Sequence, residues 1–112
     1  MTKSFIGYVR VSTKQQISGN SLSYQKEAIE TYCKINNIAL VKIYSDEGIS
    51  AYNERPSFKA CINQIRNNST INGVVVNELS RFGRSTVELI SLITEIDQLG
   101  KQFVSIKNAR LC

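Results

Sequence analysis

The chain has 112 residues, enough for one domain that buries roughly two thirds of its unfolded surface. Hydrophobic residues make up 42% of the chain and there is one proline, which excludes a disordered polar tail and favours a compact core. Fourteen Lys and Arg against nine Asp and Glu give a net charge of +5, which favours an anionic partner such as nucleic acid but is weak evidence alone.

The histidine and cysteine content narrows the metal-binding and disulfide chemistry that the chain can have. There is no histidine, and the three cysteines Cys33, Cys61 and Cys112 are far apart without CxxC spacing, so we expect no zinc site and reduced thiols. The sequence has no apolar run near ~18 residues and no signal peptide. We therefore expect a soluble cytoplasmic protein that does not contact a membrane.

The first half of the chain alternates strand and helix signals. In chain order, the predicted segments are a strand at 5–11, a polar loop at 13–20, a helix from 21 to the Asn36–Asn37 pair, a strand at 39–44 and a polar stretch at 45–56. The first strand is rich in β-forming residues. The helix is indicated by apolar residues at helical spacing, among them Leu22, Ile29 and Cys33.

The second half continues the alternation. Pro56 and Ser57 can open a helix whose apolar face is Phe58, Cys61, Ile62 and Ile65. A β-branched run at 73–76 predicts a strand covered on both faces. The sequence at 85–88 matches a capping box and opens a helix that ends at Gly100, with one predicted apolar face formed by Leu89, Ile90, Ile93, Ile96 and Leu99. A last strand is predicted at 103–106, so the pattern indicates one α/β domain with a mainly parallel sheet.

Polar residues follow two of these strands. Arg10 and Ser12 lie at the carboxyl end of the first strand, and residues 80–84 lie just past the third. If the two strands are neighbours, both loops open into one crevice, the usual ligand site of open parallel sheets.

The residue types at these two positions suit phosphate chemistry. Without histidine, Ser12 cannot be activated by an imidazole, whereas arginines suit a transition state rich in negative charge, such as that of a phosphodiester. Arg81 and Arg84 are three residues apart at a strand exit and a helix start, and Gly83 permits close backbone approach. Alone, this second cluster is more typical of a solvated basic loop; together with Arg10 and Ser12 it favours a site.

Several motifs then fall in the order and spacing of a known family. They are Tyr8-x-Arg10-Val11-Ser12-Thr13-x-x-Gln16, Gln25, Tyr44-x-Asp46-x-Gly48-Ile49-Ser50, Glu54-Arg55-Pro56 and Leu79-x-Arg81-x-Gly83-Arg84-Ser85. The chain resembles, over nearly its whole length, the catalytic domain of the serine recombinases, the resolvase and invertase family that includes large phage and transposon integrases. The resemblance implies a three-layer α/β domain with a mainly parallel central sheet of four or five strands flanked by helices.

The resemblance also implies an activity. Ser12 would attack a DNA phosphodiester, forming a 5′-phosphoserine link and releasing a 3′-hydroxyl that reverses the attack after strand exchange. Arg10, Arg81 and Arg84 would surround the scissile phosphate, and no ATP, metal or cofactor would be required. The implied partners are double-stranded DNA at a specific recombination site and further copies of the chain, as a homodimer and a synaptic tetramer of the full-length protein.

Five further residues match family positions around this site. Gln25 would orient the phosphate or the nucleophile, or else be an exposed helix residue. Asp46 and Arg55 fall in the predicted polar stretch after the second strand, and Asp46 is expected to orient an arginine because a carboxylate repels phosphate. Tyr8 is expected to pack the strand while its hydroxyl bonds a neighbour, and Gln16 is a similar supporting loop position.

Two departures from the family pattern stand out. Ser80 occupies the position where most members carry an aspartate, immediately before Arg81. The sequence also stops at Cys112, whereas family members continue into a long dimerisation helix and a DNA-binding domain. We therefore expect residues 1–112 to be the catalytic domain of a longer protein, and to be a monomer or weak dimer when isolated.

Two other readings remain open. One is a catalytically impaired relative that binds DNA or a partner, which Ser80 favours, and which Ser12 and the three arginines oppose. The other is a small flavodoxin-like module that binds phosphate or a nucleotide. That module should carry a glycine-rich loop after the first strand, and residues 12–16 contain no glycine.

Overall fold

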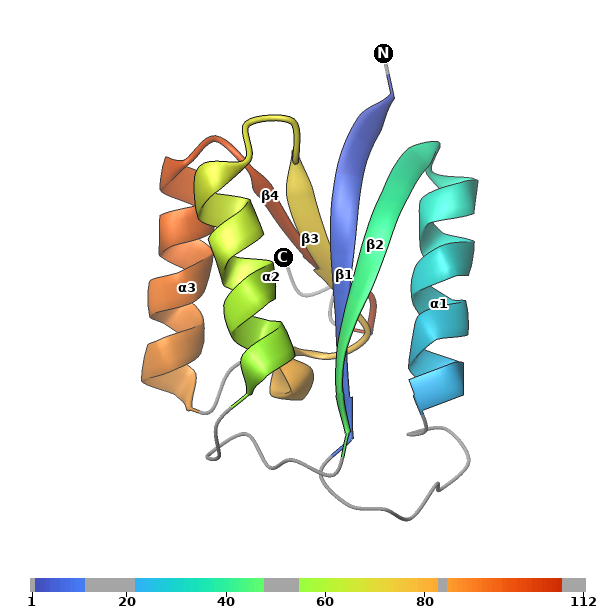
Figure 1. Ribbon diagram of the computed structural model, residues 1–112, viewed down its shortest axis with the longest axis horizontal. Coiled ribbons are helices and arrows are strands. Elements are labelled where there is room, and N and C mark those ends of the chain that lie inside the picture. Colours follow the sequence, from blue (N-terminus) through green and yellow to red (C-terminus); the bar gives the residue numbers. More distant parts are fainter. Residues whose placement is uncertain (1, 12–21, 48–54, 83–84, 108–112) are drawn as a thin grey trace.

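The computed structural model describes residues 2–11, 22–47, 55–82 and 85–107. Its elements are β1 (Lys3–Val11), α1 (Leu22–Ile35), β2 (Ile38–Glu47), α2 (Pro56–Asn67), β3 (Gly73–Val76), the 3-10 turn η1 (Leu79–Arg81), α3 (Thr86–Gln98) and β4 (Gln102–Ser105). Helices α2 and α3 cover one face of the sheet and α1 covers the other (Figure 1). Among these helices, none is long and apolar enough to be a membrane-spanning segment.

The sheet has the strand order β2-β1-β3-β4, and every strand pair is parallel. Parallel neighbours need a crossover, which helices provide here, and the crossovers bring the carboxyl ends of all four strands to one edge. Tyr8 of β1 pairs with Tyr44 of β2 on one side and with Val76 of β3 on the other. The predicted α/β domain is confirmed, and β1 and β3 are neighbours, as a shared crevice requires.

The core has two parts, one on each face of the sheet. Successive side chains of a strand point to opposite faces, so Ile6 and Tyr8 pack toward α2 and α3 while Phe5 and Val9 pack toward α1. Strand β1 is buried on both faces from Phe5 to Val11, and β3 is buried along its whole length, which explains their apolar runs.

The second strand is longer than predicted. The sequence predicted a strand at 39–44 and a loop from residue 45, yet β2 continues to Glu47 because β1 pairs with it up to Arg10 opposite Asp46 and Val11 opposite Glu47. Asp46 therefore lies within a strand, not in the loop after it. Backbone pairing to a long central strand outweighs the polar composition of residues 45–47.

The predicted apolar face of the third helix is partly wrong. Ile90 is 60% exposed and Leu99 is 42% exposed, whereas Ile96 is buried and Leu89 and Leu92 pack against the core. Positions 89, 92 and 96 follow the three- and four-residue spacing of one helix face, and residue 90 is turned about 100° away from it. Apolar composition alone does not determine which side of a helix meets the sheet.

Gly73 lies where β3 passes closest to its neighbours. A Cβ added there would lie 2.5 Å from the backbone oxygen of Gln102 and 2.7 Å from the ring of Phe5. We predict that Gly73→Ala lowers the free energy of unfolding by about 1–3 kcal/mol through overpacking, measured by urea denaturation. Gly100→Asn is the control, because Gly100 has φ +76° with open space around it and Asn tolerates that conformation. Equal stability of the Gly73→Ala variant and the wild type would contradict the prediction.

Candidate active site

Arginine side chains gather at the carboxyl edge of the two central strands. Arg10, near the end of β1, is 5% exposed, and Arg81 ends the turn η1 that follows β3. Burial lowers the pKa of the Arg10 guanidinium most, followed by the positive charge of Arg81; Arg55 also lowers this pKa, while Tyr8 and Asp46 raise it. Guanidinium groups that repel one another in a partly buried setting create a strong site for an anion.

Asp46 joins β2 to the start of α2. Its Oδ2 accepts hydrogen bonds from the Tyr8 hydroxyl at 2.7 Å and from the Phe58 N–H at 3.1 Å, and its Oδ1 accepts from the Ser57 N–H at 3.1 Å. The carboxylate, 3% exposed, thus caps the free N–H groups of the helix start. Within the described residues these hydrogen bonds go to Tyr8 and the first turn of α2, while the Asp46 charge also favours the charged form of Arg10, so the expectation that Asp46 orients an arginine stays a prediction.

Gln25 of α1 holds the backbone of Arg10. Its Nε2 donates to the Arg10 carbonyl oxygen at 3.0 Å, and its Oε1 accepts from the Arg10 N–H at 3.2 Å. The side chain is fully buried, which excludes the alternative of an exposed helix glutamine. The Gln25 side-chain amide therefore pairs with the Arg10 backbone as a neighbouring strand would, near the carboxyl end of β1.

Arg55 precedes α2 and contacts three segments. Its Nη1 donates to the Phe82 carbonyl oxygen at 3.1 Å, its guanidinium lies 3.8 Å from the centre of the Phe58 ring, and its Nη2 is 3.6 Å from Glu88 Oε1. The side chain is 5% exposed. This arginine links the start of α2, the residue that follows η1 and the first turn of α3.

Three predicted site residues, Ser12, Gln16 and Arg84, lie outside the described residues, so their roles stay predictions. The structure brings the other residues of the predicted set to one edge of the sheet: Tyr8, Arg10, Gln25, Asp46, Arg55 and Arg81. They come from the central strand β1, the edge strand β2, the start of α1, the residue before α2 and the turn η1.

The sequence analysis missed two residues beside this cluster. Glu88 was noticed only as part of a capping box; its N–H does donate to Ser85 Oγ at 3.2 Å, but its carboxylate lies near Arg55. Asn77, directly after β3, is 2% exposed, and its Nδ2 has no hydrogen-bond partner in the described part of the chain. A polar residue that follows a buried β-branched run was the available signal for Asn77. Nothing in the sequence distinguished Glu88 from an ordinary capping residue.

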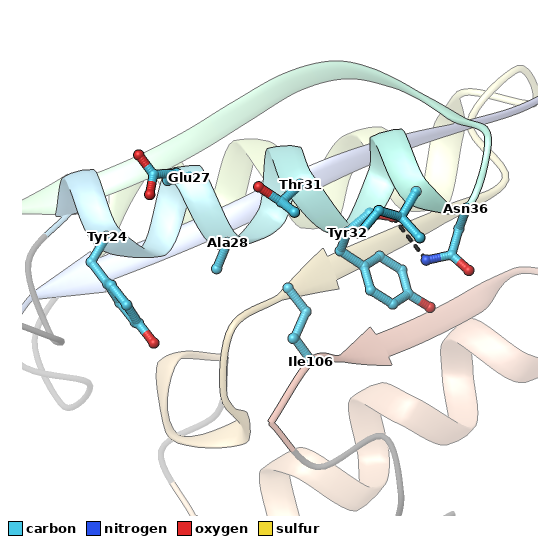
Figure 2. A pocket seen from close by; sticks show the side chains of 8 residues that line it. Tyr24, Glu27, Ala28, Thr31, Tyr32, Asn36 and Ile106 are labelled. Carbon is cyan, nitrogen blue, oxygen red and sulfur yellow. Dashed lines mark hydrogen bonds between the residues drawn. The ribbon is translucent and has the colours of Figure 1, made fainter.

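A separate groove of about 430 Å³ lies between α1 and the end of β4 (Figure 2). Tyr24 and Tyr32 of α1 and Ile106 surround it, and its described lining includes Glu27 but no lysine or arginine. This groove offers a phosphate no guanidinium group among its lining residues, so the arginine-rich edge is the candidate active site.

Comparison with known proteins assigns the family. The family described as "Resolvase, N terminal domain" matches residues 5–111. This chain belongs to the resolvase N-terminal domain family. The resemblance seen in the sequence motifs is confirmed.

Curated relatives of this resolvase N-terminal domain include transposon and phage proteins. The chain is 34% identical over 102 residues to the Transposon Tn552 DNA-invertase BinR of Staphylococcus aureus, covering 91% of this chain and 46% of that protein. It is 31% identical over 104 residues to the serine recombinase gin of Escherichia phage Mu, covering 93% of this chain and 47% of that protein. The chain thus spans about half the length of these relatives.

Solved structures agree on the fold. The N-terminal catalytic domain of TP901-1 integrase matches with a TM-score of 0.87 and 28% identity, covering 96% of this chain and 80% of that one. A resolvase family site-specific recombinase from Streptococcus pneumoniae matches with a TM-score of 0.81 and 27% identity, covering 96% and 74%. The four-stranded parallel sheet with three helices is therefore the resolvase catalytic-domain fold.

The two-point contact of Gln25 yields a stability prediction. Gln25→Leu leaves the N–H and C=O of Arg10 without this partner inside the protein, and we expect it to lower the free energy of unfolding by about 1–3 kcal/mol in urea denaturation. Gln98→Leu, at an exposed position of α3, is the matched control and should change stability by less than about 0.5 kcal/mol. Equal effects of the two substitutions would show that the buried contact contributes little.

Tyr8 yields a pH prediction. Burial, followed by the hydrogen bond to Asp46 and its negative charge, raises the pKa of Tyr8 above its ordinary value near 10. The native state keeps this proton while the unfolded chain loses it near pH 10, so the stabilisation is complete below pH 10 and declines as the pH rises further. The stability difference between wild type and Tyr8→Phe should fall by up to about 1.4 kcal/mol per pH unit above 10, in urea denaturation from pH 9 to 11.5. A constant difference over that range would contradict the assignment.

Proposed function

We propose that the protein is a site-specific DNA recombinase whose nucleophile is Ser12. The Ser12 hydroxyl loses its proton as its oxygen forms a bond to a DNA phosphorus, while the bond from that phosphorus to the 3′-oxygen breaks. The departing oxygen takes up a proton to become a 3′-hydroxyl, so there is no net change in protons. The product is a 5′-phosphoserine ester. After strand exchange the 3′-hydroxyl attacks this ester, which restores a phosphodiester and the serine.

The observation that carries this proposal is the gathering of Arg10 and Arg81 at the ends of neighbouring strands. Burial and then repulsion by Arg81 lower the pKa of Arg10, and a bound phosphate relieves that repulsion. Arginine forms bidentate hydrogen bonds with phosphate oxygens and stabilises the charge that spreads over them in the transition state. Together with Arg84, these residues surround the scissile phosphate.

The same chemistry makes ATP and a metal ion unnecessary. Each step exchanges one phosphate ester for another, so the bond energy is retained in the phosphoserine. The arginines supply the positive charge that a metal ion supplies in other phosphoryl transfers; one arginine at such a transition state is worth about 10³–10⁵ in rate. Gln25 contributes by holding the strand that carries Arg10, and Asp46 by holding Tyr8 against the start of α2.

The partner that we infer is double-stranded DNA in the cytoplasm. The net charge of +5 and the arginine-rich edge favour a polyanion, and relatives at 31–34% identity are named DNA-invertase and serine recombinase. Because the chain spans about half of those proteins, we assign the specific recombination site, the homodimer and the synaptic tetramer to the full-length protein.

A second candidate is a catalytically impaired relative that binds DNA without cutting it. Ser80, next to Arg81 in η1, favours it because most family members have an aspartate there. The two candidates differ in one product, the covalent link between protein and DNA.

The test is capture of that link. The full-length protein is expressed in its own host, denatured and isolated, and DNA that stays attached is digested and located by mass spectrometry. We expect a nucleotide joined through its 5′-phosphate to Ser12 in the wild type and no such adduct in Ser12→Ala. In Arg81→Ala we expect at least about 10³-fold less adduct.

Matched controls exist for both variants. Ser23→Ala changes an exposed serine of α1, and Arg66→Ala changes an arginine at the far end of α2 that is 51% exposed. Both should keep the wild-type amount of adduct. Absence of an adduct in the wild type supports the non-cutting relative, and an undiminished adduct in Ser12→Ala rules out Ser12 as the nucleophile.

A further inference from the structure

We propose that Glu88 is a positioning residue that acts through Arg55 to hold the turn η1 and its Arg81 in place. Its effect on DNA cleavage rests on the function proposed above, whereas its effect on the turn does not. The proposal follows from where the two ends of the Arg55–Glu88 pair are attached.

Arg55, one member of the pair, holds the turn η1 in place. Arg55 Nη1 donates to the carbonyl oxygen of Phe82, the residue directly after η1. The N–H of Phe82 donates to Leu79 O at 3.0 Å and the N–H of Arg81 donates to Glu78 O at 3.1 Å, so the turn is closed within itself. Phe82 is fully buried. Whatever fixes the Arg55 guanidinium therefore fixes the turn that carries Arg81.

The other end of the pair belongs to the first turn of α3. Glu88 N–H donates to Ser85 Oγ, and Leu89 N–H donates to Ser85 O at 2.9 Å, so Glu88 lies on a well-formed helix start. Its carboxylate approaches Arg55 Nη2 to 3.6 Å, with 24% of the glutamate side chain exposed. The ion pair thus ties Phe82 to α3, only a few residues further along the chain.

The buried positive charge of Arg55 explains why the Arg55–Glu88 ion pair is needed. The pKa of the Arg10 guanidinium is lowered first by burial, then by the positive charge of Arg81 and, to a lesser degree, by that of Arg55. Arg55 is 5% exposed and has few other ways to offset its charge, since the carboxylate of Asp46 receives the Tyr8 hydroxyl and two backbone N–H groups. Glu88 supplies a negative charge 3.6 Å from Arg55 Nη2. Without it, Arg55 is free to leave Phe82 and move toward a bound phosphate.

The chain offers a matched control for this pair. Glu95 and Arg66 also join α3 to α2, farther along the same two helices, with Arg66 Nε 2.6 Å from Glu95 Oε2 and Arg66 Nη2 3.0 Å from Glu95 Oε1. That pair is more exposed and has no contact with η1 among the described residues. Glu95→Gln therefore removes an ion pair between α2 and α3 without loosening the turn η1.

The first measurement does not depend on activity. Hydrogen exchange of the Arg81 and Phe82 amides is compared in wild type, Glu88→Gln and Glu95→Gln of the full-length protein. We expect exchange about tenfold faster in Glu88→Gln, as for the loss of the charge-assisted hydrogen bond from Arg55 to the Phe82 carbonyl, and unchanged in Glu95→Gln. Equal exchange in Glu88→Gln and wild type overturns the proposal.

The second measurement separates positioning from stability. In single-turnover formation of the protein–DNA adduct, Glu88→Gln should lower the rate about ten- to a hundredfold with unchanged DNA affinity, Glu88→Asp should recover part of the rate, and Glu95→Gln should match wild type. Adding Glu88→Gln to Arg55→Met should produce no further loss, because both changes break one link.

Equal slowing by Glu88→Gln and Glu95→Gln, or full additivity with Arg55→Met, overturns the proposal. If the wild type forms no adduct, the proposed function fails while hydrogen exchange still decides the role of Glu88.

Discussion

The repulsion between guanidinium groups at the carboxyl edge of β1 and β3 is the constraint on which the site depends. Arg10 and Arg55 are each 5% exposed, and Arg81 at the end of η1 adds its charge to theirs. Like charges taken out of water destabilise a fold unless fixed partners or a bound anion offset them. The surrounding polar side chains can be understood as the means of holding these arginines apart and in place.

Each of those side chains fixes a different part of the cluster. Gln25 bonds both backbone groups of Arg10, Asp46 joins Tyr8 to the start of α2, and Glu88 pairs with Arg55. Hydrogen bonds and an ion pair to fixed neighbours keep these side chains in one geometry before the substrate arrives. Charge that is already in position needs little reorganisation when a phosphate binds, which is the physical basis of electrostatic catalysis.

Aromatic packing provides the rigid support behind this network. Tyr8, Phe58, Phe82 and Phe103 form a continuous row with ring centres 5.3, 5.2 and 4.9 Å apart. Tyr8 is two residues from Arg10, and Phe82 follows Arg81 directly, so the row connects both arginines to the core under α2 and α3. Aromatic pairs at these separations add packing energy beyond the burial of their area.

The sequence by itself determined the alternation of strands and helices, the parallel α/β class and the family, because those depend on apolar periodicity and on motifs close together in the chain. It also located Arg10 and Arg81 after two strands and predicted a shared crevice on the condition that those strands are neighbours. Only the tertiary structure decided that Asp46 lies in a strand and caps α2, that Gln25 is buried, that Ile90 faces solvent, and that Glu88 approaches Arg55. Strand register, the rotation of a helix about its axis and the partner of a charged side chain depend on residues far apart in sequence, which local patterns do not encode.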